Sequence, residues 1–306
     1  GYLQNLAKEK IGIEFIPAVA PGETREEARR RVRSIFVHVN LTVVRLSKGQ
    51  LASLNEDNGF AIVARTIAVT HPLLKKKEGR EDRVNFDSAT VAAKSTVLTT
   101  LQALQDMCER YLEFPFRQWK SQDRGLIPMR PEDDEIKEGE ADFKELWDHL
   151  GSLPSYQRLE QGTQTPMLRR FSHEKPGGEA NILFRPIGQI ALAQALGILV
   201  FKKGLLLADI FDKLRPYDLG GGFAGVSEPK SLWYGVLYDP NKKRVLTSRR
   251  DLAAKLMVYL VAGTSDDMER GNLLKDLAKA RTFEDKAMGF DGNFVKPKEV
   301  GLPKVL

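Results

Sequence analysis

Three clusters of basic side chains carry the clearest chemistry in this sequence. Lysine and arginine neutralise the backbone phosphates of nucleic acid, and each neutralised phosphate adds salt-sensitive affinity. The cluster we rank first, the hairpin cluster, consists of Lys242, Lys243, Arg244, Arg249 and Arg250. The second lies on a predicted helix and offers Arg29, Arg30 and Arg33 as contacts. The third, the lysine loop, contains Lys75, Lys76, Lys77, Arg80 and Arg83. A solvated surface is the alternative interpretation of each cluster.

Two tyrosines accompany the hairpin cluster. Tyr234 and Tyr238 precede it in the segment Leu232–Tyr238, which is predicted to form the first strand of a β-hairpin with Arg244–Thr247. Aromatic side chains beside cations provide stacking surfaces for bases in single-stranded nucleic acid. The alternative is that they pack across the strands of a hairpin.

The residues needed for metal or covalent chemistry are scattered. The four histidines, His38, His71, His149 and His173, show no ligand spacing, which predicts that there is no metal site. Cys108 is the single cysteine, on the apolar face of a predicted helix, and we interpret it as structural. No Ser/His/Asp order, carboxylate pair or nucleotide fingerprint is evident, so the sequence supports no named reaction and no cofactor.

Two further motifs resemble binding elements weakly. The loop Gly220–Gly225 is rich in glycine but lacks the Gly-Lys-Ser/Thr ending of a phosphate loop, and a linker is the favoured interpretation. In the segment Gly188–Gly197, Ala193 and Gly197 have the spacing of the first helix and turn of a helix-turn-helix. The residues that follow are too apolar for a recognition helix, so a buried helical hairpin is favoured.

The elements that position these residues are mainly helical. Apolar periodicity predicts a helix capped by Thr24 and ending at Asn40, and further helices over 60–71, 96–112, 187–200, 205–214 and 272–281, plus one capped by Ser248. A strand is predicted over 11–17 and a β-hairpin around 239–243. Residues 114–178 are rich in Pro, Gly and charge. They predict a charged surface excursion with a short helix near 141–150 and an acidic stretch at Glu132–Glu145.

Composition sets broad limits. The chain has 306 residues, of which 42% are hydrophobic and 29% charged, and its net charge is +6. A modest positive charge permits nucleic-acid binding without requiring it. No apolar run is long enough to cross a bilayer and no signal peptide is evident, which favours a cytoplasmic protein without membrane association.

Several short sequence motifs together resemble the DndB family, the DGQHR-motif proteins associated with DNA phosphorothioation. These motifs are Phe36–Asn40, Thr42–Lys48, Leu98–Leu104, Arg185–Gln189 and the segment around Trp233. The Asp-Gly-Gln-His-Arg signature itself is absent, and we expect it upstream of Gly1. The resemblance implies a remnant of a ParB/sulfiredoxin-like α/β unit over 1–50. The residues themselves predict a mainly helical region over 51–285 and a tail rich in Gly, Pro and Lys over 286–306. The overall class expected is α/β or α+β, predominantly helical.

The resemblance also implies a function. Family members are regarded as DNA-binding repressors of the gene cluster for DNA sulfur modification, so the expected partner is double-stranded DNA, with other sulfur-modification proteins and a homo-oligomer as further possibilities. Two alternatives stay open. One is a nucleotide-binding or hydrolysing ParB-like component, with Asn40 and Arg185 as ligand contacts; against it, Asn40 caps a helix and Arg185 pairs with a carboxylate. The other is a protein–protein adaptor that docks through the acidic stretch.

Overall fold

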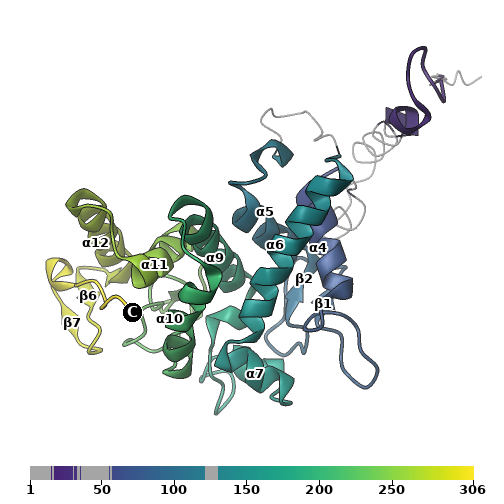
Figure 1. The fold of residues 1–306 in the computed structure, drawn as a ribbon. Coiled ribbons are helices and arrows are strands. Elements are labelled where there is room, and N and C mark those ends of the chain that lie inside the picture. The colour runs from purple at the N-terminus through teal and green to yellow at the C-terminus, as the bar shows by residue number, and fades with distance from the viewer. Residues whose placement is uncertain are drawn as a thin grey trace, which may run out of the picture. The chain divides into compact units, whose positions relative to one another are not determined.

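The computed structural model describes residues 15, 17–29, 31, 32, 35, 55, 57–120 and 130–306. The chain forms two compact units, Gly1–Arg45 and Leu46–Leu306, and each is treated by itself. Figure 1 shows the elements of the second unit, which are mostly helices. No helix in the described ranges is both long enough and apolar enough to cross a membrane.

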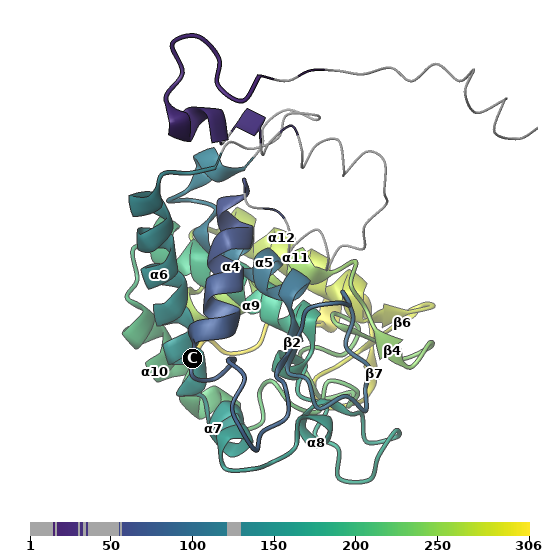
Figure 2. The same cartoon turned by 90° about the vertical axis from the view of Figure 1, so that its right-hand side faces the viewer.

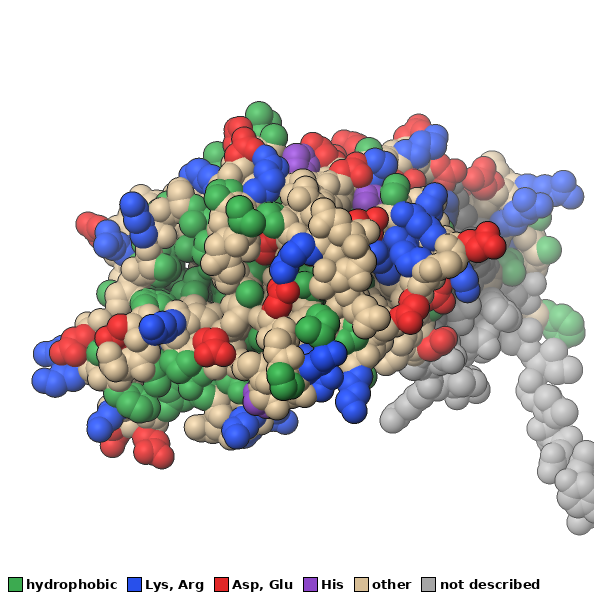
Figure 3. Space-filling model, turned by 90° about the horizontal axis from the view of Figure 1, so that it is seen from below, with side chains coloured by type: hydrophobic (Ala, Val, Ile, Leu, Met, Phe, Trp, Pro, Cys, Tyr) green, Lys and Arg blue, Asp and Glu red, His purple; other side chains and the backbone are tan. Residues whose placement is uncertain are grey.

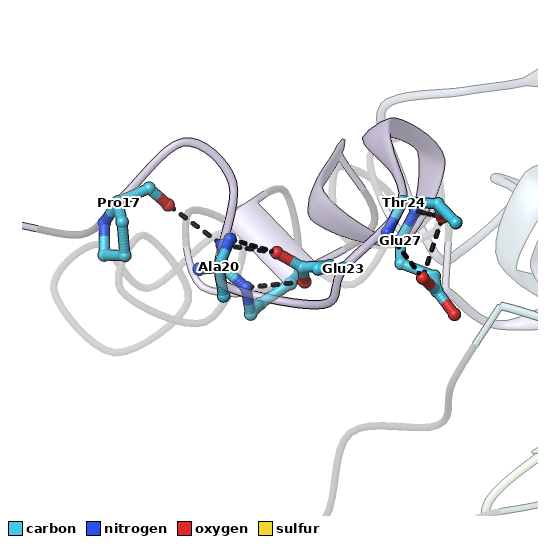
Figure 4. A network of polar contacts seen from close by, with 6 residues as sticks. Pro17, Ala20, Glu23, Thr24 and Glu27 are labelled. Carbon is cyan, nitrogen blue, oxygen red and sulfur yellow. Dashed lines mark hydrogen bonds and ion pairs between the residues drawn. The ribbon is translucent and has the colours of Figure 1, made fainter.

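In the first unit a reciprocal cap begins a helix at Thr24. The Glu27 carboxylate accepts hydrogen bonds of 2.8 Å from the Thr24 backbone N–H and hydroxyl, while the Thr24 hydroxyl accepts one of 3.2 Å from the Glu27 backbone N–H. Figure 4 shows this network. Residues 25–29 are helical, so Thr24 is the N-cap that the sequence predicts. The predicted strand over 11–17 falls almost entirely outside the described residues, and the predicted helix end at Asn40 does too.

The second unit is built around α9 (Pro186–Gly197). Its sequence is apolar on nearly every side, and all its residues except Pro186 and Gln194 are buried. Successive helices pack outward on both sides of it in the order α6, α4, α5, α9, α11, α12, which Figures 1 and 2 let the reader follow. The bounds of the others are α4 (Gly59–Thr70), α5 (Leu101–Leu112), α6 (Asp133–Gly151), α11 (Arg250–Ala262) and α12 (Asp267–Arg281).

The start of α5 differs from the prediction. The apolar pattern predicts the helix from residue 96, but Thr100 caps it by accepting from the Ala103 backbone N–H at 3.0 Å. Residues Thr99–Thr100 form β2 instead, which pairs in parallel with β1 (Val84–Asn85). The Thr100 hydroxyl competes with continuation of the helix upstream, as short hydroxyl side chains do.

The expectation of a surface excursion over 114–178 is wrong. This region contains α6, then α7 (Pro154–Glu160) and α8 (Thr165–Arg169). Phe143, Trp147 and Tyr156 are fully buried in the core. The physical reason is that α6 is amphipathic: its apolar residues recur at helical spacing between acidic ones, which dilutes the pattern without removing it.

Two helix ends also differ from the sequence prediction. A π-helix, η3 (Ile198–Lys202), extends α9, and α10 (Leu207–Leu219) continues past Pro216, where the sequence predicts its end. Pro216 removes one backbone hydrogen bond, and the turn beyond is completed by the Gly220 N–H donating to the Pro216 carbonyl at 3.0 Å. The start of α11 also differs: Arg249 rather than the predicted Ser248 occupies the N-cap position, and no side chain caps the helix.

The C-terminal segment is folded, which corrects the expectation of a tail over 286–306. Strands β5 (Thr282–Phe283), β6 (Lys286–Met288) and β7 (Phe294–Val295) form an antiparallel sheet, and a 3-10 turn, η4 (Pro297–Glu299), follows. Ala287 and Val300 are buried. The chain end stays close to α11, because the Leu306 N–H donates to the Leu260 carbonyl at 2.8 Å. The fold class is thus predominantly helical with small sheets, as expected.

Candidate nucleic-acid interface

The predicted β-hairpin is present, and a short turn shapes its tip. Strand β3 (Tyr238–Asp239) pairs antiparallel with β4 (Arg244–Val245). The Asp239 carboxylate accepts hydrogen bonds from the backbone N–H groups of Asn241 and Lys242 at 3.0 and 3.1 Å, an Asx turn. Lys243 has a φ of 49°, the left-handed conformation that closes such turns. The residues expected to extend the first strand, 232–237, form turns instead, apart from Tyr234, which makes an isolated β-bridge with Tyr238.

This turn places three of the five predicted cations side by side at the tip. Lys242, Lys243 and Arg244 are consecutive, exposed, and without an ion pair among the residues that the structure describes. Their charges are therefore not neutralised within this part of the chain. We call these three residues the hairpin tip.

The other two cations of the hairpin cluster, Arg249 and Arg250, contact protein groups and have structural roles. The Arg249 guanidinium donates to the Gly235 carbonyl and, at 2.8 Å, to the Ala280 carbonyl. Arg250 lies 3.5 Å from the Asp251 carboxylate and is only partly exposed. Through its Nη1 atom, Arg249 thus ties the hairpin base to the end of α12.

A second arginine, which no local sequence pattern singles out, strengthens the same junction. Arg281 is fully buried and donates to the carbonyls of Pro229, Ser231 and Met288 at 2.6–2.7 Å, with longer bonds to Tyr234 and Gly289. Burial lowers the pKa of its guanidinium to about 10, so the group is charged at neutral pH. Five carbonyl acceptors from two segments hold this charge, and the hairpin base is fixed as a result.

The two tyrosines pack inside the hairpin region rather than facing outward together. Tyr238 is 4% exposed and its ring lies 4.9 Å from that of Phe171. Tyr234 is half-buried, 5.9 Å from Tyr238 and 5.6 Å from Phe283. Burial raises the pKa of both phenols. The structure therefore favours the packing interpretation for Tyr238.

The remaining predicted contacts are only partly described. Arg29 is exposed in the first unit, whereas Arg30, Arg33 and Asn40 lie outside the described residues. Arg31, two residues after Arg29, pairs with Glu23 at 2.8 Å and donates to the Pro17 carbonyl at 2.9 Å.

Arg185 is engaged at the start of α9. Its guanidinium lies 4.2 Å from the centre of the Phe171 ring, donates to the Arg169 carbonyl at 3.0 Å, and stands 3.7 Å from the Glu174 carboxylate. Burial lowers the pKa of Arg185, and Glu174 opposes that shift. These contacts are the carboxylate pairing that stands as the alternative to a ligand contact.

The lysine loop is largely neutralised by one carboxylate. Glu160 lies 3.9 Å from Lys77, 3.6 Å from Arg80, and in a hydrogen bond with Arg83. Lys76 is 3.6 Å from Asp82. Arg83 is also buried and donates to the Leu73 carbonyl at 2.9 Å. This cluster has less free charge to offer a phosphate than the hairpin tip.

The weaker motifs have structural positions. Cys108 is fully buried, and burial raises the pKa of its thiol well above the usual value. The loop at 220–225 is packed: Phe223 is buried, and the Gly222 carbonyl accepts from the Trp233 indole at 2.7 Å. Gly197 continues as helix into η3, without the turn of a helix-turn-helix. Within the described ranges no group of histidine, cysteine and carboxylate side chains could hold a metal ion.

Charge across the surface is mixed. On the face seen in Figure 3, lysine and arginine side chains are interspersed with aspartate and glutamate. Residues 242–306 contain fourteen Lys and Arg against nine Asp and Glu, an excess of five within the net +6 of the chain. The local sequence motifs do not predict this excess of positive charge in the C-terminal part, although a running count of charge along the chain reveals it.

Comparison with known proteins gives no further assignment: no family model, no curated protein and no solved structure matches the chain.

Proposed function

We propose that this protein is a DNA-binding regulator that represses a gene cluster for DNA phosphorothioation. The observation that carries the DNA-binding part is the hairpin tip, where Lys242, Lys243 and Arg244 present three unpaired charges in a row. The resemblance to the DndB family supports the regulatory part. A ParB-like α/β unit over 1–50, a cytoplasmic location, other sulfur-modification proteins as partners and a homo-oligomer belong to the same proposal.

The geometry suits contact with the phosphate backbone. Adjacent phosphates on one strand lie several ångströms apart, within reach of neighbouring long side chains, and a hairpin can approach a groove without the rest of the protein colliding. Arg249 and Arg281 fix the hairpin base through carbonyl hydrogen bonds. A fixed base means that fewer backbone degrees of freedom have to be ordered when DNA binds.

The test is binding to duplex DNA measured by fluorescence anisotropy over a salt series. The variant K242A/K243A/R244A removes the tip charges from an exposed loop, so its fold should persist. We expect weaker binding to all sequences and a log–log salt slope smaller by about 0.9 for each phosphate that the variant no longer neutralises. The duplexes are the promoter upstream of the protein's own gene and a scrambled control.

The matched control removes three exposed cations elsewhere, in the variant K94A/R117A/K304A. It has the same net charge as the tip variant, so a general electrostatic effect would lower affinity equally in both. An unchanged affinity and slope in the tip variant would contradict the assignment. Equal binding to promoter and scrambled duplex would contradict sequence preference while leaving phosphate binding intact.

An adaptor role is the second candidate, and α6 favours it. The helix buries one face and exposes acidic side chains over Glu132–Glu145 on the other, among them Asp134, Glu138 and Glu145. Co-purification with sulfur-modification proteins, lost when these three become glutamine or asparagine, would support it. The nucleotide-binding alternative rests on Asn40 and Arg185, of which Arg185 is already occupied by protein groups.

A further inference from the structure

A groove with an apolar floor and a lysine rim runs along α12. Leu274 and Ala278 of α12, with Val300 after η4, form the floor, and Lys275, Lys279 and Lys298 stand at the rim. The volume is about 690 Å³, within the range typical of binding sites. We call this cavity the α12 groove.

The groove is elongated. Its lining on α12 begins at Gly271 and ends just beyond the helix at Thr282, a path of roughly 16 Å at the helical rise of about 1.5 Å per residue. A cavity of this length beside a helix accommodates an extended or helical peptide segment, which lays successive side chains along it.

The charges in the groove have one sign. Lys275 and Lys279 are one helical turn apart, Lys298 stands on the opposite wall, and no acidic residue lines the cavity. All three lysines are exposed, and in the described part of the chain none belongs to an ion pair. Leu274 and Ala278, between these cations, are only partly buried. Apolar surface left open beside unneutralised cations is complementary to an apolar group flanked by carboxylates.

We propose that the α12 groove binds an acidic peptide segment of a partner protein, with an apolar side chain on the floor and carboxylates against the lysines. DNA fits less well, because a phosphodiester backbone brings charge without an apolar body and would leave the partly exposed Leu274 and Ala278 uncovered. The proposal does not depend on DNA binding by the hairpin tip, which lies on a different element.

The first experiment identifies the chemistry that the groove selects. A phage-displayed library of random peptides about 12 residues long is selected on the full chain and, in parallel, on the variant K275E/K279E. We expect peptides recovered on the wild type to share an apolar residue between Asp or Glu residues, and the variant not to enrich them. Recovery of no shared sequence, or of the same peptides on both proteins, would overturn the proposal.

The second experiment measures the affinity of the selected peptide by anisotropy. We expect K275Q/K279Q to weaken binding about tenfold, and replacement of the peptide's acidic residues by amides to do the same. R270Q, which removes an exposed charge on the same helix outside the lining, should change affinity less than about twofold. Gly271→Trp should block the groove without unfolding the helix, because a Cβ atom there meets nothing within 4 Å; circular dichroism checks the fold.

Two further arms separate the possible outcomes. A duplex of about 20 base pairs should not displace the peptide, and the groove variants should keep wild-type DNA affinity. Displacement by DNA, together with loss of DNA affinity in the groove variants, would assign the groove to DNA and overturn the proposal. The variant K242A/K243A/R244A should bind the peptide as the wild type does, so failure of the hairpin assignment leaves this result unaffected.

Discussion

At the scale of single residues, His71 shows how hydrogen-bond partners fix a protonation state. His71 is 4% exposed. Its Nδ1 accepts from the Leu73 backbone N–H at 3.2 Å, so Nε2 carries the proton and donates to the Asp148 carboxylate at 3.0 Å. Protonation at Nδ1 would set two N–H groups against each other.

This arrangement predicts loss of stability on acidification. Burial lowers the pKa of His71, and the hydrogen bond to Asp148 only partly opposes it. As pH falls below the ordinary histidine value of about 6.5, the unfolded chain therefore binds a proton that the folded chain does not. For Asp148, burial raises the pKa, but hydrogen bonds from Lys144 and His71 outweigh burial and lower it. Asp148 therefore adds a further loss below about pH 4.

The measurement is the free energy of unfolding in urea between pH 8 and pH 5. We expect the wild-type value to decrease across this interval. His71→Gln should be less stable at pH 8 and show a smaller decrease on acidification. The control His173→Gln changes an exposed histidine and should keep the wild-type pH dependence. Equal slopes in wild type and His71→Gln would contradict the argument.

At the scale of elements, the contact between α5 and α9 leaves no room for a side chain at Gly197. A Cβ atom added to Gly197 would lie 2.7 Å from the Tyr111 carbonyl oxygen and 2.8 Å from that of Arg110. Both atoms belong to the backbone of α5, which cannot turn aside as a flexible side chain can. Glycine at this position lets the two helices approach closely at the centre of the array.

Gly197→Ala should therefore destabilise the protein, although alanine favours a helix. The helix preference gains about 1 kcal/mol, whereas forcing packed helices apart costs about 1–3 kcal/mol, so a net loss of up to roughly 2 kcal/mol is expected. Gly271→Ala on α12 is the matched control. Its Cβ meets nothing within 4 Å, so it should be neutral or stabilising in urea denaturation. Equal effects of the two substitutions would argue against a close α5–α9 approach.

Elements also show what a sequence pattern can and cannot predict. α9 is predictable because it is apolar on nearly every side, and the hairpin because Asp239-Pro-Asn-Lys-Lys243 is a turn sequence. The predicted helix near 141–150 lies within α6, but the first part of α6, from Asp133, escapes prediction because acidic residues mask its apolar stripe. The tip cations follow from the turn, but the roles of Arg249 and Arg281 depend on carbonyls at Gly235, Ala280 and Met288. No local pattern reveals such acceptors, because they come from segments that meet only in the folded chain.

At the scale of the whole molecule, the last twenty-one residues illustrate the same difference most clearly. Their Gly, Pro and Lys content predicts a tail, yet the Met288 and Gly289 carbonyls accept from Arg281 at 2.7 and 3.2 Å. The Tyr259 hydroxyl of α11 donates to the Pro303 carbonyl at 2.9 Å. The segment therefore closes over α11 and α12, and the charge of Arg281 depends on it for two of its five acceptors.

A chain ending at Asp285 should consequently unfold at a lower temperature than the full chain. It loses the burial of Met288 and Val300, worth about 1.5–3 kcal/mol each, and leaves Arg281 with buried N–H groups that lack acceptors. A loss of about 3 kcal/mol corresponds to a decrease in Tm of at least about 6 °C for a unit of this size. Differential scanning calorimetry measures it, with a chain ending at Pro303 as a control that keeps β6, β7 and η4 and should lose less. If the chain ending at Asp285 had the same Tm as the full chain, residues 286–306 would be the loose tail that their composition predicts.

The same truncation should also abolish peptide binding in the α12 groove, because η4 forms one wall of that groove. DNA affinity should decrease only if the truncation loosens the base of the hairpin, since the hairpin tip itself is retained.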